Sequence, residues 1–255
     1  MRKPATFFIF LLAIGVVLNP PPALAQGKTP DFKEANALYE SGKFKEAAQI
    51  YETIAEEKSG GAAVFYNLAN ALLREGQKGK ARLWYERALL LKPRDPDIRW
   101  NLQILKNALI DRAEQPPDPL ALSLVRQNVV DLFSIDEAIL LLTACLFVLA
   151  GLSLLAWLYP AARRVIRVFQ GLFLILTLAA AGFFTLKWIQ AKDPAVIVLS
   201  NEAVARYGPT LKETKAFILH EGAKVSVVDR TKDWFYIRFE NGNEGWIPKD
   251  SCELV

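Results

Sequence analysis

The chain has 255 residues, of which 52% are hydrophobic, and its formal net charge is only +4. The charges are spread along the chain without a polybasic tract, which argues against nucleic acid as a partner. The two cysteines, Cys145 and Cys252, lie in an apolar run and in a polar segment respectively, so the sequence shows no disulfide framework.

The N-terminal segment 1–25 has the three parts of a secretory signal peptide. Positions 2–3 are basic, positions 7–18 form an apolar core too short to span a membrane, and positions 23–25 fit the A-x-A cleavage pattern. We therefore expect an exported chain that begins at Gln26. An uncleaved anchor is the alternative interpretation.

Residues 26–112 contain an internal repeat, because several residues recur 34 positions later in the chain. The matching pairs are Ala35 and Ala69, Leu38 and Leu72, Gly42 and Gly76, Ala47 and Ala81, and Tyr51 and Tyr85. A period of 34 is typical of tetratricopeptide repeats, in which small residues let two helices approach and glycine permits the turn between them. We expect repeats at 28–61 and 62–95 and a capping helix at 96–111.

The first helix of each repeat supplies the concave face of such a domain. The candidate partner-binding residues there are Asn36, Tyr39, Tyr66, Asn70, Arg74, Trp100 and Ile104. Tyr66 and Trp100 could equally be packed between helices. Asn36 and Asn67 fall at the asparagine positions of tetratricopeptide domains that clamp a carboxylate. The basic positions of that clamp instead carry Phe32, Asp97 and Asn101, so we expect no carboxylate clamp.

The linker at 113–134 begins with a proline-rich break at 114–119. The residues after it place apolar side chains on one helical face. We expect an amphipathic helix that lies on the membrane surface. A helix packed on the repeats is the alternative, and the sequence does not separate the two.

Two apolar runs, 138–159 and 168–186, contain no charged residue. Each is long enough to cross a hydrocarbon core of roughly 30 Å as a helix. We therefore predict transmembrane helices at 136–159 and 168–190, joined by a loop at 160–167.

That loop carries Arg163, Arg164 and Arg167, so the positive-inside rule places it in the cytoplasm. A cleaved signal peptide leads to the same orientation. We expect a multi-pass protein of the bacterial inner membrane whose two soluble parts both lie on the periplasmic side.

From residue 193 to 255 the pattern changes to short runs rich in β-branched and aromatic residues, at 196–199, 225–228, 234–239 and 245–247. This pattern predicts a small all-β barrel. In the third run we assign Phe235, Ile237 and Phe239 to the core and the alternating Trp234, Tyr236 and Arg238 to a more exposed face.

The order of features in this last segment resembles a bacterial SH3 domain. The resemblance is carried by residues 205–209, 220–225, 234–237 and 242–247, and the closing Gly245-Trp246-Ile247 is its most specific piece. The candidate binding surface of the SH3-like domain comprises Tyr207, Trp234, Tyr236 and Trp246.

No residue pattern indicates an active site. His220 is the only histidine, and no cluster of cysteine and histidine accompanies it. A wall-cleaving hydrolase would need paired carboxylates, which we cannot place in one site. We therefore expect no metal, no cofactor and no enzymatic activity.

The sequence thus predicts a multi-domain membrane protein with all-α tetratricopeptide hairpins, two transmembrane helices and a C-terminal SH3-like barrel. This combination resembles the tetratricopeptide–SH3 member of the Bat group, named for Bacteroides aerotolerance operons. The phrase at 217–222, followed by Trp234 and 245–247, carries much of the resemblance.

The resemblance implies a scaffold that works with membrane proteins containing von Willebrand A domains and with a MoxR-type ATPase, in stress or oxygen tolerance. We expect a non-enzymatic adaptor whose two modules bind envelope proteins. The alternative is a cell-wall sensor whose SH3-like domain binds peptidoglycan.

Overall fold

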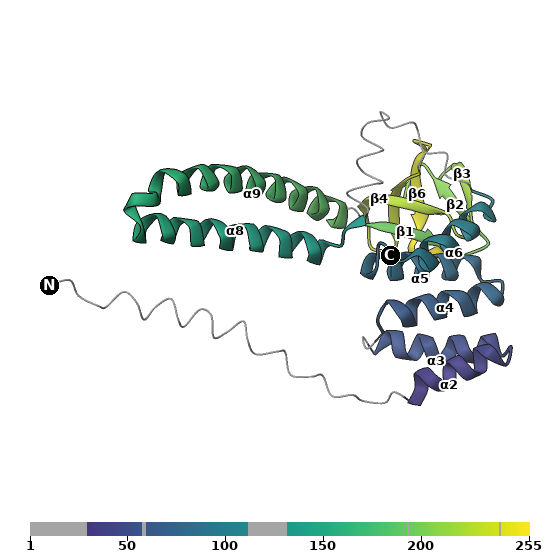
Figure 1. The fold of residues 1–255 in the computed structure, drawn as a ribbon. Coiled ribbons are helices and arrows are strands. Elements are labelled where there is room, and N and C mark those ends of the chain that lie inside the picture. Colours follow the sequence, from purple (N-terminus) through teal and green to yellow (C-terminus); the bar gives the residue numbers. More distant parts are fainter. Residues whose placement is uncertain (1–29, 58–59, 112–131, 193, 240) are drawn as a thin grey trace.

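The computed structural model describes residues 30–57, 60–111, 132–192, 194–239 and 241–255 (Figure 1). The expected signal peptide lies outside the described residues, as does almost all of the expected interfacial helix. The described chain forms a helical repeat domain, a helical hairpin and a β-barrel.

The repeat domain consists of consecutive antiparallel helices: α2 (Pro30–Glu40), α3 (Phe44–Glu56), α4 (Ala62–Arg74), α5 (Lys78–Leu91) and α6 (Pro96–Asn107). Its core contains the recurring alanines and tyrosines, and Ala35, Ala47, Ala69 and Ala81 are fully buried. The turns after α2 and α4 contain Gly42 and Gly76 at φ of 82° and 79°. The expected helical repeat fold is confirmed.

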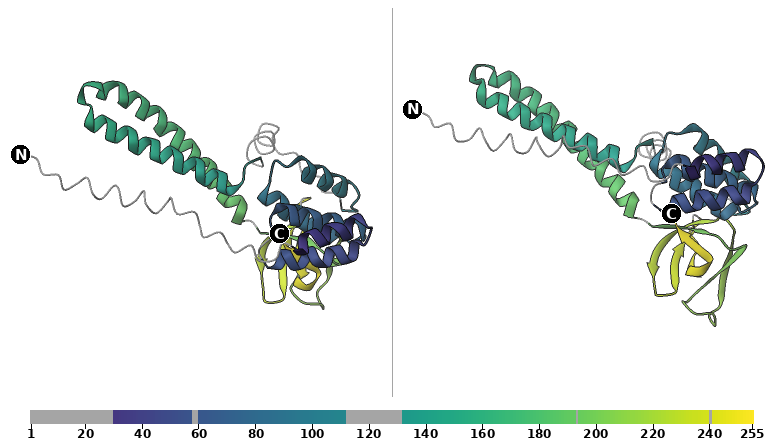
Figure 2. Two further views of the ribbon diagram at one scale, coloured as in Figure 1. Left: turned by 60° about the horizontal axis from the view of Figure 1, so that its bottom comes forward. Right: turned by 90° about the horizontal axis from the view of Figure 1, so that it is seen from below.

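The hairpin consists of α8 (Ile135–Leu158) and α9 (Arg163–Lys192), joined by the 3₁₀ turn Pro160–Ala162. It projects from the rest of the molecule, with its tip at the far end (Figures 1 and 2). Both helices are long and apolar enough to cross a membrane. α9 begins directly at Arg163, so the helix extends into the segment 160–167 that was expected to connect the two spans, since arginine is a good helix former.

The barrel is an antiparallel sheet in the order β3-β2-β6-β5-β4-β1-β7. Its strands are β1 (Ala195–Val198), β2 (Glu202–Arg206), β3 (Lys215–His220), β4 (Lys224–Arg230), β5 (Trp234–Arg238), β6 (Glu244–Pro248) and β7 (Cys252–Leu254). Phe235 and Ile237 are buried, and Phe239 packs partly on the same core. Trp234 and Tyr236 are half-buried on the other face, so the predicted alternation is confirmed.

The barrel packs directly on the repeat domain through a contact that we call the joint. It joins α5 and residues 108–111 to β1, the turn at 220–222, Lys224 and the end of β7. Leu83 of α5 and Ile197 of β1 are buried and belong to neither core. Ile197 alternates with Val196 and Val198, which point into the barrel, so its side chain faces outward toward α5.

Two glycines permit the close approach at the joint. A Cβ atom at Gly79 would lie 2.7 Å from the carbonyl oxygen of Val198, and one at Gly222 would lie 2.6 Å from Leu109 Cδ2. Glycine inside a helix costs up to about 1 kcal/mol relative to alanine. The close contact with Val198 therefore explains why glycine stands at position 79, although helix propensity disfavours it.

The turn at 220–222 is held from both sides by the repeat domain. Glu221 Oε1 accepts a hydrogen bond of 2.8 Å from the backbone N–H of Gly79, in the first turn of α5. This acidic side chain caps a helix start whose own N-cap residue, Gln77, provides no side-chain cap. Asp111 accepts a hydrogen bond of 2.5 Å from the backbone N–H of His220.

The centre of the joint is the buried carboxylate of Glu86. Lys224 Nζ donates to Glu86 Oε2 at 2.8 Å, and Arg82 Nε and Lys106 Nζ each lie 3.7 Å from Oε1. Arg82 Nη1 also donates to the carbonyl oxygen of Gly222 at 2.6 Å. Burial alone raises the pKa of Glu86, but Lys224, Lys106 and Arg82 outweigh it and lower the pKa to about 2. Glu86 therefore stays ionised and links both domains.

We predict that Glu86→Gln opens the joint. The substitution leaves the cations of Arg82 and Lys224 without their counter-ion, and removing one partner of a buried ion pair costs about 3–5 kcal/mol. Hydrogen–deuterium exchange across α5 and residues 215–230 should then become at least about a hundredfold faster. Glu56→Gln, on the exposed end of α3, is the matched control and should leave exchange unchanged. Unchanged exchange in Glu86→Gln would contradict this role.

We also predict that acid opens the joint through Glu86. Its pKa is lowered from 4.5 to about 2 in the folded protein. Its contribution to stability is therefore complete above about pH 4.5 and is lost as the pH falls toward 2. Protection factors, which compare measured with intrinsic exchange, should fall more over this window in the wild-type protein than in Glu86→Gln, because the variant lacks the titrating group. Equal pH dependence in the two proteins would be the opposing result.

Candidate protein-binding surfaces

The repeat domain carries a periodic set of polar side chains that we call the asparagine–tyrosine row. It contains two equivalent sets, 34 residues apart: Asn36, Tyr51 and Asn67, and then Asn70, Tyr85 and Asn101. In the first set, Asn36 Oδ1 accepts hydrogen bonds from the Tyr51 hydroxyl at 2.6 Å and from Asn67 Nδ2 at 3.2 Å. Each set takes its members from three successive helices.

The second set repeats this geometry one helical pair further along. Asn70 Oδ1 accepts from the Tyr85 hydroxyl and from Asn101 Nδ2, the latter at 3.1 Å. Asn101 Nδ2 also donates to the Tyr66 hydroxyl at 2.9 Å. The same arrangement in both sets shows that the 34-residue repeat extends to the polar surface as well as to the core.

Both tyrosines remain protonated donors. Burial is the main cause that raises the pKa of Tyr51, and it also raises the pKa of Tyr85. Because each hydroxyl donates to an asparagine Oδ1, the carbonyl side of that amide is fixed in place. Among the described residues, Nδ2 of Asn36 and Nδ2 of Asn70 have no hydrogen-bond partner, so both amides keep donors for a ligand.

A pocket of about 320 Å³ lies at the row and is lined by Asn36, Tyr39, Glu40, Tyr51, Asn67 and Asn70. Its lining has one charged side chain, Glu40, and no basic one. Such a surface can satisfy the N–H and C=O groups of an extended main chain. It lacks the cations that would bind a terminal carboxylate.

Of the other predicted residues of this domain, two pack on the Phe44 ring and two are exposed on α6. The Arg74 guanidinium lies 4.5 Å from the centroid of the Phe44 ring, and Tyr39 packs edge-on against the same ring. Trp100 is 69% exposed and Ile104 is 49% exposed on α6. Packing between helices, the alternative for Trp100, is therefore wrong.

The barrel presents a second candidate surface, the aromatic face of β5 and β6. Tyr236 and Trp246 pair across the two strands with ring centroids 5.1 Å apart, and Trp234 shares their face two residues along β5. The Tyr236 hydroxyl donates to Glu244 Oε2 at 2.8 Å, which fixes the ring. Tyr207 is 70% exposed just after β2 and has no ring contact with these residues.

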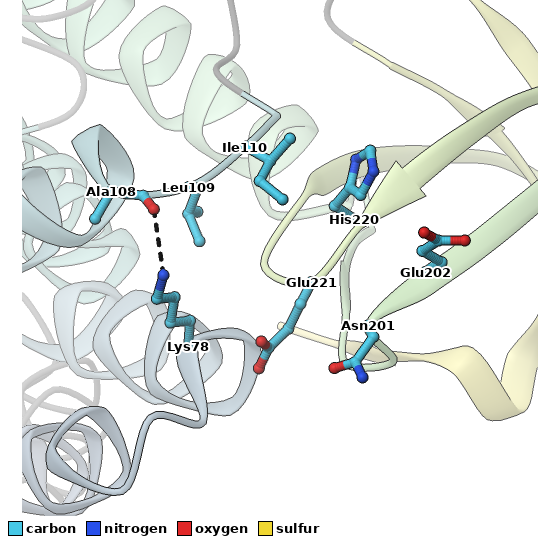
Figure 3. Close-up of a pocket in the computed structure, with 8 residues that line it drawn as sticks. All are labelled: Lys78, Ala108, Leu109, Ile110, Asn201, Glu202, His220 and Glu221. Atoms are coloured by element: carbon cyan, nitrogen blue, oxygen red, sulfur yellow. Dashed lines mark hydrogen bonds between the residues drawn. The ribbon is translucent and has the colours of Figure 1, made fainter.

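A pocket of about 310 Å³ lies between the two domains (Figure 3). Lys78, Ala108, Leu109 and Ile110 line it from the repeat domain, and Asn201, Glu202, His220 and Glu221 line it from the barrel. Lys78 Nζ donates to the Ala108 carbonyl at 3.5 Å, and His220 Nδ1 lies 3.0 Å from Asp111 Oδ1. Of its polar residues, His220 and Glu221 take part in the joint, whereas the bond of Lys78 lies within the repeat domain.

The described residues give no indication of catalytic chemistry. Within them, no group of three histidine, cysteine or acidic side chains could hold a metal ion. Burial raises the pKa of the Cys252 thiol to about 11, which keeps it protonated at neutral pH.

The residues of the joint were missed in the sequence, although a signal was present. At three of its positions the second repeat departs from the first: Gly79 replaces Lys45, Arg82 replaces Ala48 and Leu83 replaces Gln49. When such sequence differences between two repeats fall on one face of a helix, they indicate a surface that is buried in one repeat and not in the other. Tyr51 and Tyr85 recur with the 34-residue period and lie in the core, and their hydroxyls also organise the row.

The comparisons with known proteins agree with both domains. Residues 32–97 match the family described as Tetratricopeptide repeat, and residues 200–251 match the family described as Bacterial SH3 domain. The comparison with curated proteins finds no match for the chain. Both matched domains are typically non-catalytic and point to protein–protein interaction, and the bacterial SH3 domain also points to cell-wall binding.

Proposed function

We propose that the protein is a non-enzymatic, membrane-anchored adaptor whose repeat domain binds an extended segment of an envelope protein. The asparagine–tyrosine row is the observation that carries this proposal. Its two sets present amide groups at a regular interval, as the main chain of an extended segment requires. A neutral hydrogen-bonding surface of this kind selects for backbone conformation more than for charge.

The aromatic face of the barrel is the second binding surface. The rings of Tyr236 and Trp246 pack on each other, and Glu244 fixes the Tyr236 hydroxyl, so little side-chain entropy would be lost when a partner covers these two rings. The contacts of the joint come from β1, the turn at 220–222, Lys224 and β7, which leaves the outer face of β5 and β6 available. One chain would thus hold two partners in a fixed position and orientation relative to each other.

The partners that we propose are membrane proteins with von Willebrand A domains and the MoxR-type ATPase system, in stress or oxygen tolerance. This part rests on the resemblance of the whole domain order to the Bat group. The matched repeat and SH3 domains support protein binding of this general kind.

We further propose that the hairpin crosses the inner membrane and leaves both domains on the periplasmic side. Its outward surface is almost entirely apolar, as a lipid-exposed hairpin requires. Arg163, Arg164 and Arg167 lie at its tip, and both soluble domains lie at its other end (Figure 1). The positive-inside rule then places the tip in the cytoplasm.

We predict that Asn36→Asp with Asn70→Asp weakens partner binding through the row. Each aspartate keeps the oxygen that accepts from tyrosine and asparagine, but it replaces the outward N–H donors with a carboxylate oxygen. Losing hydrogen bonds to the ligand and gaining repulsion should lower affinity at least about tenfold. Co-purification of von Willebrand A proteins and the ATPase from detergent extracts, followed by mass spectrometry, is the measurement.

Gln49→Ala is the matched control, because it removes an exposed amide from α3 outside the row. It should retain wild-type binding, and circular dichroism should show equal helicity in all variants. The adaptor proposal fails if the wild-type protein enriches no envelope protein, or if the double variant enriches the same set.

A second candidate function is a cell-wall sensor, and the aromatic face favours it because aromatic rings also stack on sugars. The match of residues 200–251 to a bacterial SH3 domain supports the same possibility. If peptidoglycan is the ligand, the full protein in detergent should sediment with purified sacculi, and Trp234→Ala should reduce this severalfold. Ile218→Ala, on exposed β3, is the control. No sedimentation of the wild-type protein would exclude the sensor.

A further inference from the structure

The loop between α5 and α6 lies at the base of the hairpin. Arg94 pairs with Glu137 in the first turn of α8, and its guanidinium lies 5.2 Å from the centroid of the Phe133 ring. Phe133 in turn packs edge-on against Phe183 of α9, with centroids 5.7 Å apart. The repeat domain is thereby held at the level where α8 begins and where α9 approaches its C-terminal end (Figure 1).

The end of α5, immediately before this loop, is apolar and exposed. Leu90 is 63% exposed and Leu91 is 52% exposed, and neither joins the core of the repeat domain. The equivalent residues of the first repeat, 34 positions earlier, are the acidic Glu56 and Glu57. Acidic side chains at this helix end have therefore been replaced by leucines only in the repeat that lies beside the hairpin.

From these contacts we propose that Leu90 and Leu91 insert into the interfacial region of the lipid bilayer, so that the repeat domain rests on the membrane surface. This inference depends on the proposed function in one respect, namely that the hairpin spans a membrane. The exposed leucines lie shortly before Arg94, which contacts Phe133 and the first turn of α8. The neighbouring Lys92 is exposed and can reach phosphate groups of the lipids.

Lipid is the occupant that the position favours. Apolar side chains gain free energy when they enter the interface, and basic side chains beside them are attracted to anionic headgroups. Glutamates would oppose both effects, which accounts for the difference between the repeats. Contact with the membrane at this loop, together with the pair between Arg94 and Glu137, would fix the tilt of the repeat domain.

Photo-crosslinking of the full chain tests the proposal. Benzoylphenylalanine replaces Leu91 in protein reconstituted into nanodiscs of phosphatidylethanolamine and phosphatidylglycerol, and lipid adducts are quantified by mass spectrometry. A second variant carries the probe at Phe147, in the middle of α8 and 69% exposed, as the positive control. A third carries it at Ile110, which is 74% exposed in the same domain.

Ile110 lies beyond the far end of α6, and the 12 residues of that helix separate the two sites by about 18 Å. We expect lipid adducts at Leu91 at about the level of Phe147, and at least about tenfold fewer at Ile110, because interfacial insertion is shallow. Adducts at Leu91 as rare as at Ile110, or adducts with protein instead of lipid, overturn the proposal while Phe147 still reacts. No adduct at Phe147 would instead overturn the membrane-spanning hairpin, and this inference with it.

Discussion

The arrangement of the molecule depends on the buried carboxylate of Glu86. It lies on α5, is 7% exposed, and is neutralised by cations from its own helix, from α6 and from the barrel. A buried charge of this kind contributes specificity, because any other docking geometry would remove its nearest cation, Lys224 of the barrel. Gly79 and Gly222 then allow the backbones to approach, and Glu221 caps the helix that carries Glu86. Arg87 completes the contact by binding Glu253 and the carbonyl of Leu254.

This contact changes what an adaptor built from these two domains can do. Two modules on separate flexible tethers would bind two partners independently, and the gain would depend on linker length. Here the asparagine–tyrosine row and the aromatic face belong to one body, which is attached to the hairpin through Arg94 and Phe133. Partners held by this body would have a defined orientation relative to each other and to the proposed membrane.

The sequence predicted those features that follow from local periodicity. The 34-residue repeat predicted the helical hairpins, and alternation in β5 predicted which residues are buried. Three strands were missed for identifiable reasons: β2 buries the small Ala203 and Ala205, β3 was recognised only as a family phrase, and β7 has three residues. The joint could not be predicted directly, because it pairs residues 79–87 with residues 221–254, and the departures of the second repeat from the first mark only one side of this contact. Asn36 and Asn70 were predicted as surface residues, but the hydroxyls that orient them were not.

The contacts of the joint make one rigid body of the repeat domain and the barrel. Pulsed electron paramagnetic resonance between spin-labelled unnatural residues at Lys45 and Arg230, both exposed, tests it in the full chain in nanodiscs. We expect one narrow distance distribution for the wild-type protein. We expect a broad distribution for Gly79→Ala, whose new Cβ would lie 2.7 Å from the Val198 carbonyl oxygen. A broad distribution in the wild-type protein, or no change in Gly79→Ala, would contradict the claim.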